Sequence, residues 1–292
     1  MNRISAACAA VFCAAVIGLS GCGAVPASSG GASAAQSVTP AKTAAMDPSV
    51  PRGQAAVHRD PEVKYSVPEG VSVLMYHMIG NDPNNAAIMT AENLRWQMKY
   101  LKDNGYHPIT MQELHDYVTK GAALPEKPVC ITFDDGYEDN YTIVYPLMKE
   151  YGFPWTLFVI TGSVGNPNRV TWDQLKEMAD SQAVTISNHT VTHPKLHNLS
   201  PEEVKKEITG AQQALKEHLG IDNHWIAYPY GDYDETVDAI AKAAGIDLAV
   251  TTDSGRVHQG SYPYELKRVW IGNEVNKTKY AERLAKDDYT II

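Results

Sequence analysis

The chain has 292 residues and a formal net charge of −9, from 34 acidic and 25 basic side chains. An acidic protein without a run of lysine and arginine is a poor binder of nucleic acid, so we exclude nucleic acid as a partner. The residues that follow the predicted signal and tether, described next, are sufficient for one domain of barrel size.

The N-terminus has the features of an export signal. Arg3 precedes an apolar stretch, residues 4–19, that is too short to span a bilayer comfortably and is followed by Ser20-Gly21-Cys22. This ending resembles a bacterial lipoprotein signal, which is cut before Cys22 and carries lipid on that sulfur; a plain secretory signal is the alternative. We therefore expect residues 1–21 to be removed and the protein to be a membrane-anchored lipoprotein on the extracytoplasmic side.

Residues 22–62 are predicted to form a flexible tether. From Gly23 to about Arg59 the chain consists mainly of Ala, Ser, Gly, Thr and Pro, without an aromatic residue. Such a segment buries too little apolar surface to offset the entropy lost on ordering. The folded domain is then expected to span residues 63–292.

Strand-like and helix-like segments alternate through this domain. Runs rich in β-branched and aromatic residues predict strands, and amphipathic stretches predict helices. Strands are expected near Val71, Val129 and Val184 and over residues 155–161, 225–228 and 248–251, and helices over residues 91–104, 111–120, 139–151, 172–180, 201–219 and 235–244. The alternation predicts an α/β barrel.

Two carboxylates, Asp134 and Asp135, follow the apolar run that begins at Val129. The run is typical of a buried parallel strand that leads into a helix, and α/β folds bind ligands at the carboxyl ends of such strands. Because side chains alternate along a strand, we expect the two carboxylates to point to opposite faces and to have different roles. The alternative is that Asp-Asp-Gly is only a turn.

Two histidines, His189 and His193, follow a second predicted strand, residues 183–187. A spacing of four places both imidazoles on one side of a turn, where they can share one ion. Taken alone, such a pair can equally be a surface feature. Together with the carboxylates it forms the Asp/His/His set that a catalytic divalent metal needs, with one carboxylate left as a base.

Three motifs in order resemble those of the polysaccharide deacetylases, the carbohydrate esterase family 4 or NodB-homology group. The motifs are Thr132-Phe133-Asp134-Asp135-Gly136, His189-Thr190-Val191-Thr192-His193 and Ala227-Tyr228-Pro229-Tyr230-Gly231. The similarity covers roughly residues 71–271. The resemblance implies a distorted (β/α) barrel of about seven strands and hydrolysis of acetyl groups on a sugar polymer.

The resemblance also implies roles for individual residues. Asp135, His189 and His193 would hold zinc, with cobalt, nickel or iron as other candidates, and Asp134 would be the general base. The backbone N–H of Tyr230 would stabilise the oxyanion of the transition state. Without the family, the segment around Tyr230 would be interpreted as an ordinary loop.

The sequence departs from the family pattern at two positions. Ala227 stands where an arginine usually orients the base, and Arg268 is a candidate replacement from another strand end, or else a surface or structural cation. No histidine lies near Leu266, where the family often has its general acid. His77 is our candidate acid because Met75-Tyr76-His77 is similar to the branch acting on poly-N-acetylglucosamine; alternatively, His77 merely ends a strand.

Aromatic side chains near the motifs are candidates for stacking on sugar rings: Tyr137, Trp172, Tyr230 and Trp270. The predicted function is metal-dependent removal of acetyl groups from N-acetylhexosamine units of an exopolysaccharide or peptidoglycan. The alternative is a catalytically weak, cell-surface carbohydrate-binding protein on the same fold. The sequence leaves open the polymer, the choice between N- and O-acetyl groups, the metal and the oligomeric state.

Overall fold

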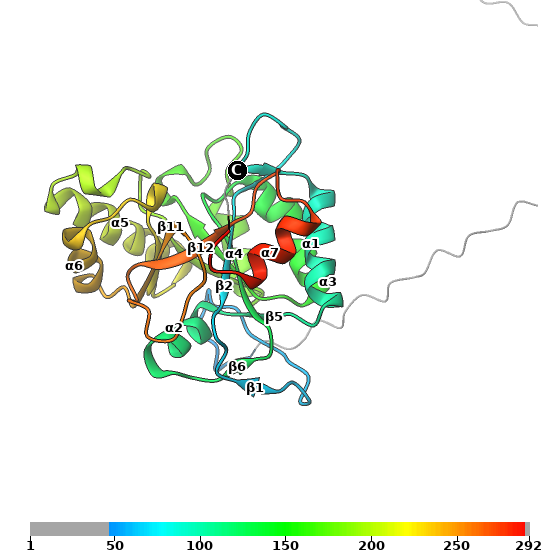
Figure 1. Cartoon of the computed structure of the whole chain (residues 1–292). Helices are drawn as coiled ribbons and strands as arrows, with labels where there is room; N and C mark the ends of the chain where they lie inside the picture. The colour runs from blue at the N-terminus through cyan, green and yellow to red at the C-terminus, as the bar shows by residue number, and fades with distance from the viewer. Residues whose placement is uncertain (1–46, 290–292) are drawn as a thin grey trace, which may run out of the picture. The chain divides into compact units, whose positions relative to one another are not determined.

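The computed structural model of the protein describes residues 47–289. The predicted signal peptide, the predicted lipidation site Cys22 and the predicted tether up to residue 46 lie outside the described residues. Strands and helices alternate along the described chain, and the helices surround the strands (Figure 1). No helix within residues 47–289 has both the length and the apolar character needed to cross a membrane.

Seven parallel strands close into a barrel, as the sequence predicts. Each strand pairs with the next, and the last pairs with the first. The order is β2 (Ser72–Tyr76), β7 (Pro128–Phe133), β8 (Trp155–Val159), β9 (Val184–Asn188), β10 (Trp225–Ala227), β11 (Leu248–Ser254) and β12 (Leu266–Trp270). The first five of these strands are buried along their whole length, which explains their continuous apolar runs.

An eighth strand, β5 (His107–Ile109), distorts the barrel. It pairs with the first half of β7, residues Pro128 to Cys130, whereas β8 pairs with Thr132 and Phe133 at the far end of the same strand. Because β2 occupies the other edge of β7, β5 and β8 must share one edge. The sequence did not predict this three-residue strand.

Seven α-helices accompany the strands within residues 47–289, and six of them lie where amphipathic patterns predict them, with one difference in type. They are α1 (Ala91–Asp103), α2 (Met111–Lys120), α3 (Tyr145–Tyr151), α4 (Trp172–Asp180), α5 (Pro201–Leu219), α6 (Glu235–Ala243) and α7 (Lys277–Ala285). Capping boxes at Thr110, Thr171 and Ser200 begin three of them. The single helix predicted over residues 139–151 is instead a π-helix, Asn140–Val144, followed by α3.

Several elements were not predicted, including α7 and two pairs of two-residue strands. The antiparallel pair is β1 (Tyr65–Ser66) with β6 (Leu124–Pro125), and the parallel pair is β3 (Met78–Ile79) with β4 (Ile88–Met89). These strands are too short for a periodic signal in the sequence.

The N-terminal segment corrects the predicted boundary between tether and domain. From Asp47 onward the chain already contacts the barrel, so a tether extending to residue 62 is too long. The Ile186 N–H on β9 donates to the Gly53 carbonyl at 2.9 Å, and the Ala56 N–H donates to the Gln182 carbonyl at 2.8 Å. Strand β10 pairs with β9 only through Ile226 and Asn188, the last residue of β9, so the N-terminal segment takes up backbone groups of β9 that a longer β10 would otherwise satisfy.

Candidate active site

The predicted site residues converge on one pocket at the carboxyl ends of the barrel strands. The pocket has a volume of about 480 Å³. Its lining includes six of the seven residues predicted for catalysis or metal binding: His77, Asp134, Asp135, His189, His193 and Tyr230. Tyr137 and Trp270 also line it, whereas Trp172 stacks on His218 with ring centroids 4.1 Å apart and is not part of the lining.

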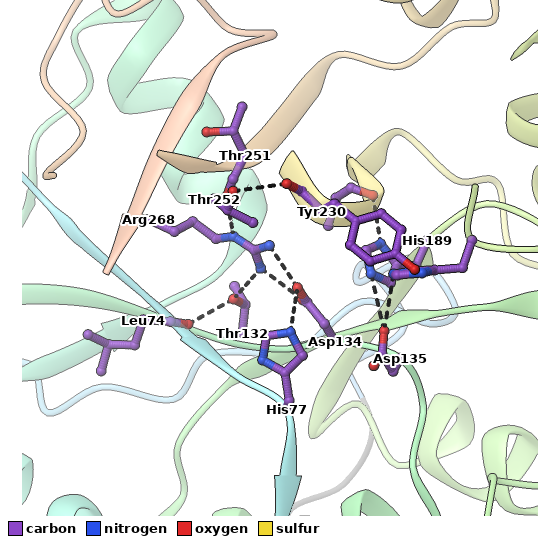
Figure 2. A network of polar contacts seen from close by, with 12 residues as sticks. Leu74, His77, Thr132, Asp134, Asp135, His189, Tyr230, Thr251, Thr252 and Arg268 are labelled. Carbon is purple, nitrogen blue, oxygen red and sulfur yellow. Dashed lines mark hydrogen bonds and ion pairs between the residues drawn. The ribbon is translucent and has the colours of Figure 1, made fainter. Parts of the chain in front are cut away.

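Arg268, the seventh residue, lies behind the pocket and holds Asp134. Its Nη1 and Nη2 donate to the two carboxylate oxygens at 2.8 and 2.7 Å (Figure 2). Both side chains are buried, with 0% of Arg268 and 2% of Asp134 exposed. Two parallel hydrogen bonds fix the plane of the carboxylate as well as its position.

Two further donors of Arg268 are also used. Nε donates to the Thr251 carbonyl at 2.7 Å, and Nη1 donates to the Thr132 hydroxyl at 3.2 Å. The Thr251 carbonyl is available because β11 and β12 pair irregularly between Val250 and Ser254. Burial by itself raises the pKa of Asp134, but the charge and hydrogen bonds of Arg268 outweigh it and keep the pKa below its ordinary value.

His77 faces the same carboxylate from β2. Its Nε2 lies 4.0 Å from Asp134 Oδ2, which is too long for a hydrogen bond but places both groups on one side of the pocket. The imidazole packs against Trp270 with ring centroids 5.2 Å apart, and the His77 carbonyl accepts a hydrogen bond from Asn140 Nδ2 at 3.1 Å. Burial lowers the pKa of His77 despite the nearby carboxylates.

Asp135, His189 and His193 form a cluster suited to a divalent cation. Asp135 Oδ1 lies 3.4 Å from His189 Nε2 and 3.5 Å from His193 Nε2, and the three ligand atoms lie within 4.8 Å of one another. This Asp135 oxygen is buried without a hydrogen-bond partner, which is the state expected of an oxygen that accepts a metal.

Both histidines can present an imidazole nitrogen to a metal. His189 Nδ1 lies 2.7 Å from the Ala227 carbonyl, so the proton sits on Nδ1 and leaves the Nε2 lone pair free. Burial, reinforced by His189, lowers the pKa of His193 to about 4. The donor set of two imidazoles and one carboxylate therefore fits a catalytic Zn²⁺ or a similar ion.

The backbone at the site differs from what the sequence predicts, although the side chains converge as expected. Strand β7 ends at Phe133, and Asp135 has a left-handed φ of 76°, so both carboxylates line one pocket instead of pointing to opposite faces. The histidine segment is not a helical turn, because Thr190 and His193 have φ values of 65° and 62°. Left-handed residues other than glycine often cluster at active sites.

Tyr230 also has a left-handed backbone, with φ of 60°. Its carbonyl accepts a hydrogen bond from the Thr252 hydroxyl at 3.1 Å, and its ring lies edge-on to His193 at 4.5 Å between centroids. The side chain is 59% exposed at the rim of the pocket. The structure thus places the Tyr230 ring beside a predicted metal ligand, and the role of the Tyr230 backbone N–H as an oxyanion donor stays a prediction.

Sequence reasoning missed the residues that hold the site from outside. Asn140 contacts the backbone of His77, Arg169 contacts the backbone of Asp135, and Thr252 contacts that of Tyr230. Each contact joins a side chain to a carbonyl in another segment, so no local pattern reveals it. For Asn140 alone of these three residues, proximity in sequence to the Asp-Asp-Gly motif could have suggested a role at the site.

The fold and the site together are those of a barrel hydrolase, in which a three-residue cluster suited to a metal lies beside the buried ion pair of Arg268 and Asp134. Comparisons with known proteins agree. A family model described as polysaccharide deacetylase matches residues 121–249. YxkH of Bacillus subtilis (strain 168), named as a candidate polysaccharide deacetylase, is 34% identical over 209 residues, covering 72% of this chain and 74% of YxkH. The chain therefore belongs to the polysaccharide deacetylase family, whose members are hydrolases acting on carbon–nitrogen bonds.

Two further relatives show a similar relationship. The poly-β-1,6-N-acetyl-D-glucosamine N-deacetylase of Staphylococcus aureus (strain MSSA476) is 29% identical over 194 residues, covering 61% of this chain and 66% of that enzyme. The solved structure of the Streptococcus pyogenes deacetylase PplD in complex with acetate has a TM-score of 0.70 and 29% identity, covering 74% of this chain and 98% of PplD.

Proposed function

We propose that this protein removes acetyl groups from N-acetylhexosamine units of a polysaccharide outside the cytoplasm, in a reaction that depends on a divalent metal. The observation that carries the proposal is the juxtaposition of two groups in one pocket. A carboxylate locked by Arg268 lies beside the convergent Asp135, His189 and His193 cluster.

The cluster of Asp135, His189 and His193 would hold the metal. A bound divalent ion lowers the pKa of water and polarises the acetyl carbonyl. Asp134 is placed to take the proton from the attacking water, since Arg268 fixes the carboxylate and keeps it ionised. The Tyr230 N–H would stabilise the oxyanion that develops on the carbonyl oxygen.

His77 would complete the reaction by protonating the leaving amine. The water oxygen bonds to the acetyl carbon, the C–N bond breaks, and the amine leaves as the second product, with acetate as the first. His77 Nε2 lies 4.0 Å from Asp134 Oδ2 in the same pocket, so acid and base can both reach one scissile bond. Among residues 47–289, His189 and His193 are the other histidines that line the pocket.

The substrate we propose first is poly-β-1,6-N-acetylglucosamine, with peptidoglycan as the second polymer to test. The support is the name of the Staphylococcus aureus relative and the early histidine at position 77. A pocket of about 480 Å³ has the size of a site for one acetylated sugar, and Tyr137 and Trp270 supply aromatic walls.

The location is also a proposal. We propose export and lipid attachment at Cys22, from the residues that precede it. A Cys22→Ser variant should lose incorporation of radiolabelled palmitate and appear in the soluble extracytoplasmic fraction. Persistence of the label in that variant would contradict lipidation at this position.

Acetate release tests the proposed reaction. Metal-stripped protein is incubated with poly-β-1,6-N-acetylglucosamine and with N-acetylglucosamine oligomers, with and without added Zn²⁺ or Co²⁺. We expect release only with added metal. Glycan binding without acetate release would instead support the carbohydrate-binding alternative. That alternative draws on the absence of the usual family arginine at Ala227, but Arg268 donates two hydrogen bonds to Asp134 and can take the place of that arginine.

A further inference from the structure

We infer that Arg169 is a positioning residue that sets the metal affinity of the site by holding the backbone of Asp135. The inference rests on the proposed metal-dependent function. Arg169 lies on the loop between β8 and α4, far from the sequence motifs that carry the ligands. Its Nη1 donates to the Asp135 carbonyl at 2.9 Å.

The backbone of Asp135 needs such support. Asp135 and Gly136 are consecutive left-handed residues, with φ values of 76° and 71°. Glycine adopts this conformation freely, but an aspartate has a Cβ that crowds the following carbonyl. An extended Asp135 would continue the alternation of strand β7 and direct its carboxylate away from His189 and His193. The left-handed conformation is therefore what brings the third ligand to the cluster.

A short segment of the loop fixes both left-handed residues. Residues 168–170 run antiparallel to residues 136–138, with a β-bridge between Tyr137 and Arg169. The Val170 N–H donates to the Gly136 carbonyl at 3.0 Å, and the Glu138 N–H donates to the Asn168 carbonyl at 3.0 Å. Arg169 adds the bond to the Asp135 carbonyl. Both carbonyls of the left-handed pair thus have donors from the same three residues.

Arg169 also contacts the wall of the pocket. Its guanidinium lies 4.1 Å from the centroid of the Tyr137 ring, and Tyr137 lines the pocket. A cation over an aromatic face is attracted to it, so the ring and the guanidinium hold each other in place. One side chain therefore links the ligand Asp135 to the surface that we propose contacts sugar.

Metal affinity measured without turnover tests this role. Metal-free wild type, Arg169→Met and Arg169→Lys are titrated with Zn²⁺ in competition with a chromophoric chelator. We expect Arg169→Met to raise the Kd about 10- to 100-fold, the range for loss of an outer contact to a metal ligand. Arg169→Lys keeps a cation and one donor and should lie between Met and wild type. The visible spectrum of the Co²⁺-loaded variant should change as well.

Two controls separate positioning from general damage. Arg95→Met removes an exposed arginine paired with Glu150 on the surface and should leave the Kd unchanged. Thermal unfolding of each metal-free variant shows whether it is folded, and Arg169→Lys serves if Arg169→Met is not.

The outcomes distinguish this inference from the proposed function. A folded Arg169 variant with the wild-type Kd and Co²⁺ spectrum would overturn the positioning role. Wild type that binds Zn²⁺ but releases no acetate would contradict the proposed reaction and leave the role of Arg169 standing. If wild type binds no Zn²⁺, both fall.

Discussion

Arg268 and Asp134 form a buried ion pair in which two guanidinium nitrogens each donate to a different carboxylate oxygen. The two residues come from β12 and the end of β7, and β2 lies between these strands in the barrel. The pair therefore spans the point where the first and last strands meet, and closure of the barrel is what assembles it. Removing one partner would leave a buried charge without compensation.

Loss of Arg268 should reduce both stability and activity. We expect Arg268→Met to lower the free energy of unfolding by about 3–5 kcal/mol, as for other buried ion pairs broken on one side. Acetate release should fall because the Asp134 carboxylate is no longer fixed. Urea unfolding and initial rates measure the two effects. The double variant Asp134→Asn/Arg268→Met should unfold less readily than the sum of the single changes predicts; strict additivity would argue against a coupled pair.

Asp134→Asn should abolish turnover and keep the metal. The amide has nearly the same shape as the carboxylate but does not take a proton from water, so we expect a loss of about 10²- to 10⁴-fold in kcat. Metal content by elemental analysis should match wild type, because the proposed ligands are Asp135, His189 and His193. Substantial activity in this variant would show that another group is the base.

His77→Ala should slow deacetylation of the sugar amide by about 10²- to 10⁴-fold without loss of metal. The reason is that an amine leaving group needs a proton as the C–N bond breaks. A 4-nitrophenyl acetate ester does not, because its phenolate leaves readily, and its hydrolysis should be nearly unaffected. Equal losses with both substrates would mean that His77 acts in another way than as the acid.

Asp139 predicts a pH dependence of stability that is independent of the metal ligands. Burial raises its pKa to about 6 from 3.8. The folded state thus binds the proton more tightly than the unfolded state, so this stabilisation is fully present below pH 3.8 and is lost as the pH rises through 6. Ionised Asp139 costs about 1–2 kcal/mol at pH 7 after allowance for solvent screening.

Asp139→Asn removes this charge and keeps an oxygen to accept the Ile79 N–H, which bonds Asp139 Oδ1 at 2.9 Å. We expect the variant to be more stable than wild type at pH 7 and the difference to shrink toward pH 4. Urea unfolding at several pH values measures it, and the difference between the two proteins cancels the titration of other carboxylates. Parallel pH profiles would mean that the Asp139 pKa is not raised.

The chemistry of the site was predictable from sequence because its polar residues follow recognisable strands. Asp134, Asp135 and His189 each come after an apolar run, and parallel strands place their carboxyl ends together. The local backbone was not predictable. Left-handed φ values at Asp135 and His193 depend on contacts with distant segments, and a propensity argument contains no such contacts.

The fold was predictable where segments are long and periodic. Arg268 could be named as a candidate from its place near a strand end, but its partner is 134 positions away in the sequence, and only barrel closure brings them together. The N-terminal segment shows the opposite failure. Its composition is typical of a linker, yet its backbone groups form hydrogen bonds with the barrel. Composition does not reveal such bonds, because they are made by the backbone and not by the side chains.

This N-terminal segment gives the last prediction. A chain that begins at residue 63, the boundary expected from sequence, should be less stable than one that begins at residue 47. Without the segment, the Ile186 N–H and the Thr185 hydroxyl lose their partners Gly53 and Ala55, and the buried Ala55 side chain is removed from the barrel. At about 1 kcal/mol for each hydrogen bond, the loss from these two bonds should be about 2 kcal/mol.

Thermal unfolding of the two shortened chains, measured side by side, tests this stabilisation. A matched substitution in the longer chain is Gly53→Ala, because Gly53 has φ of 72° and an added Cβ would lie 2.2 Å from Ile221 Cδ1. This change should displace the segment and lower the melting temperature part of the way toward that of the shorter chain. Since the segment contacts β9, which leads to His189, the shorter chain should also bind Zn²⁺ more weakly; identical melting temperatures and Kd values would show that the segment contributes nothing to the barrel.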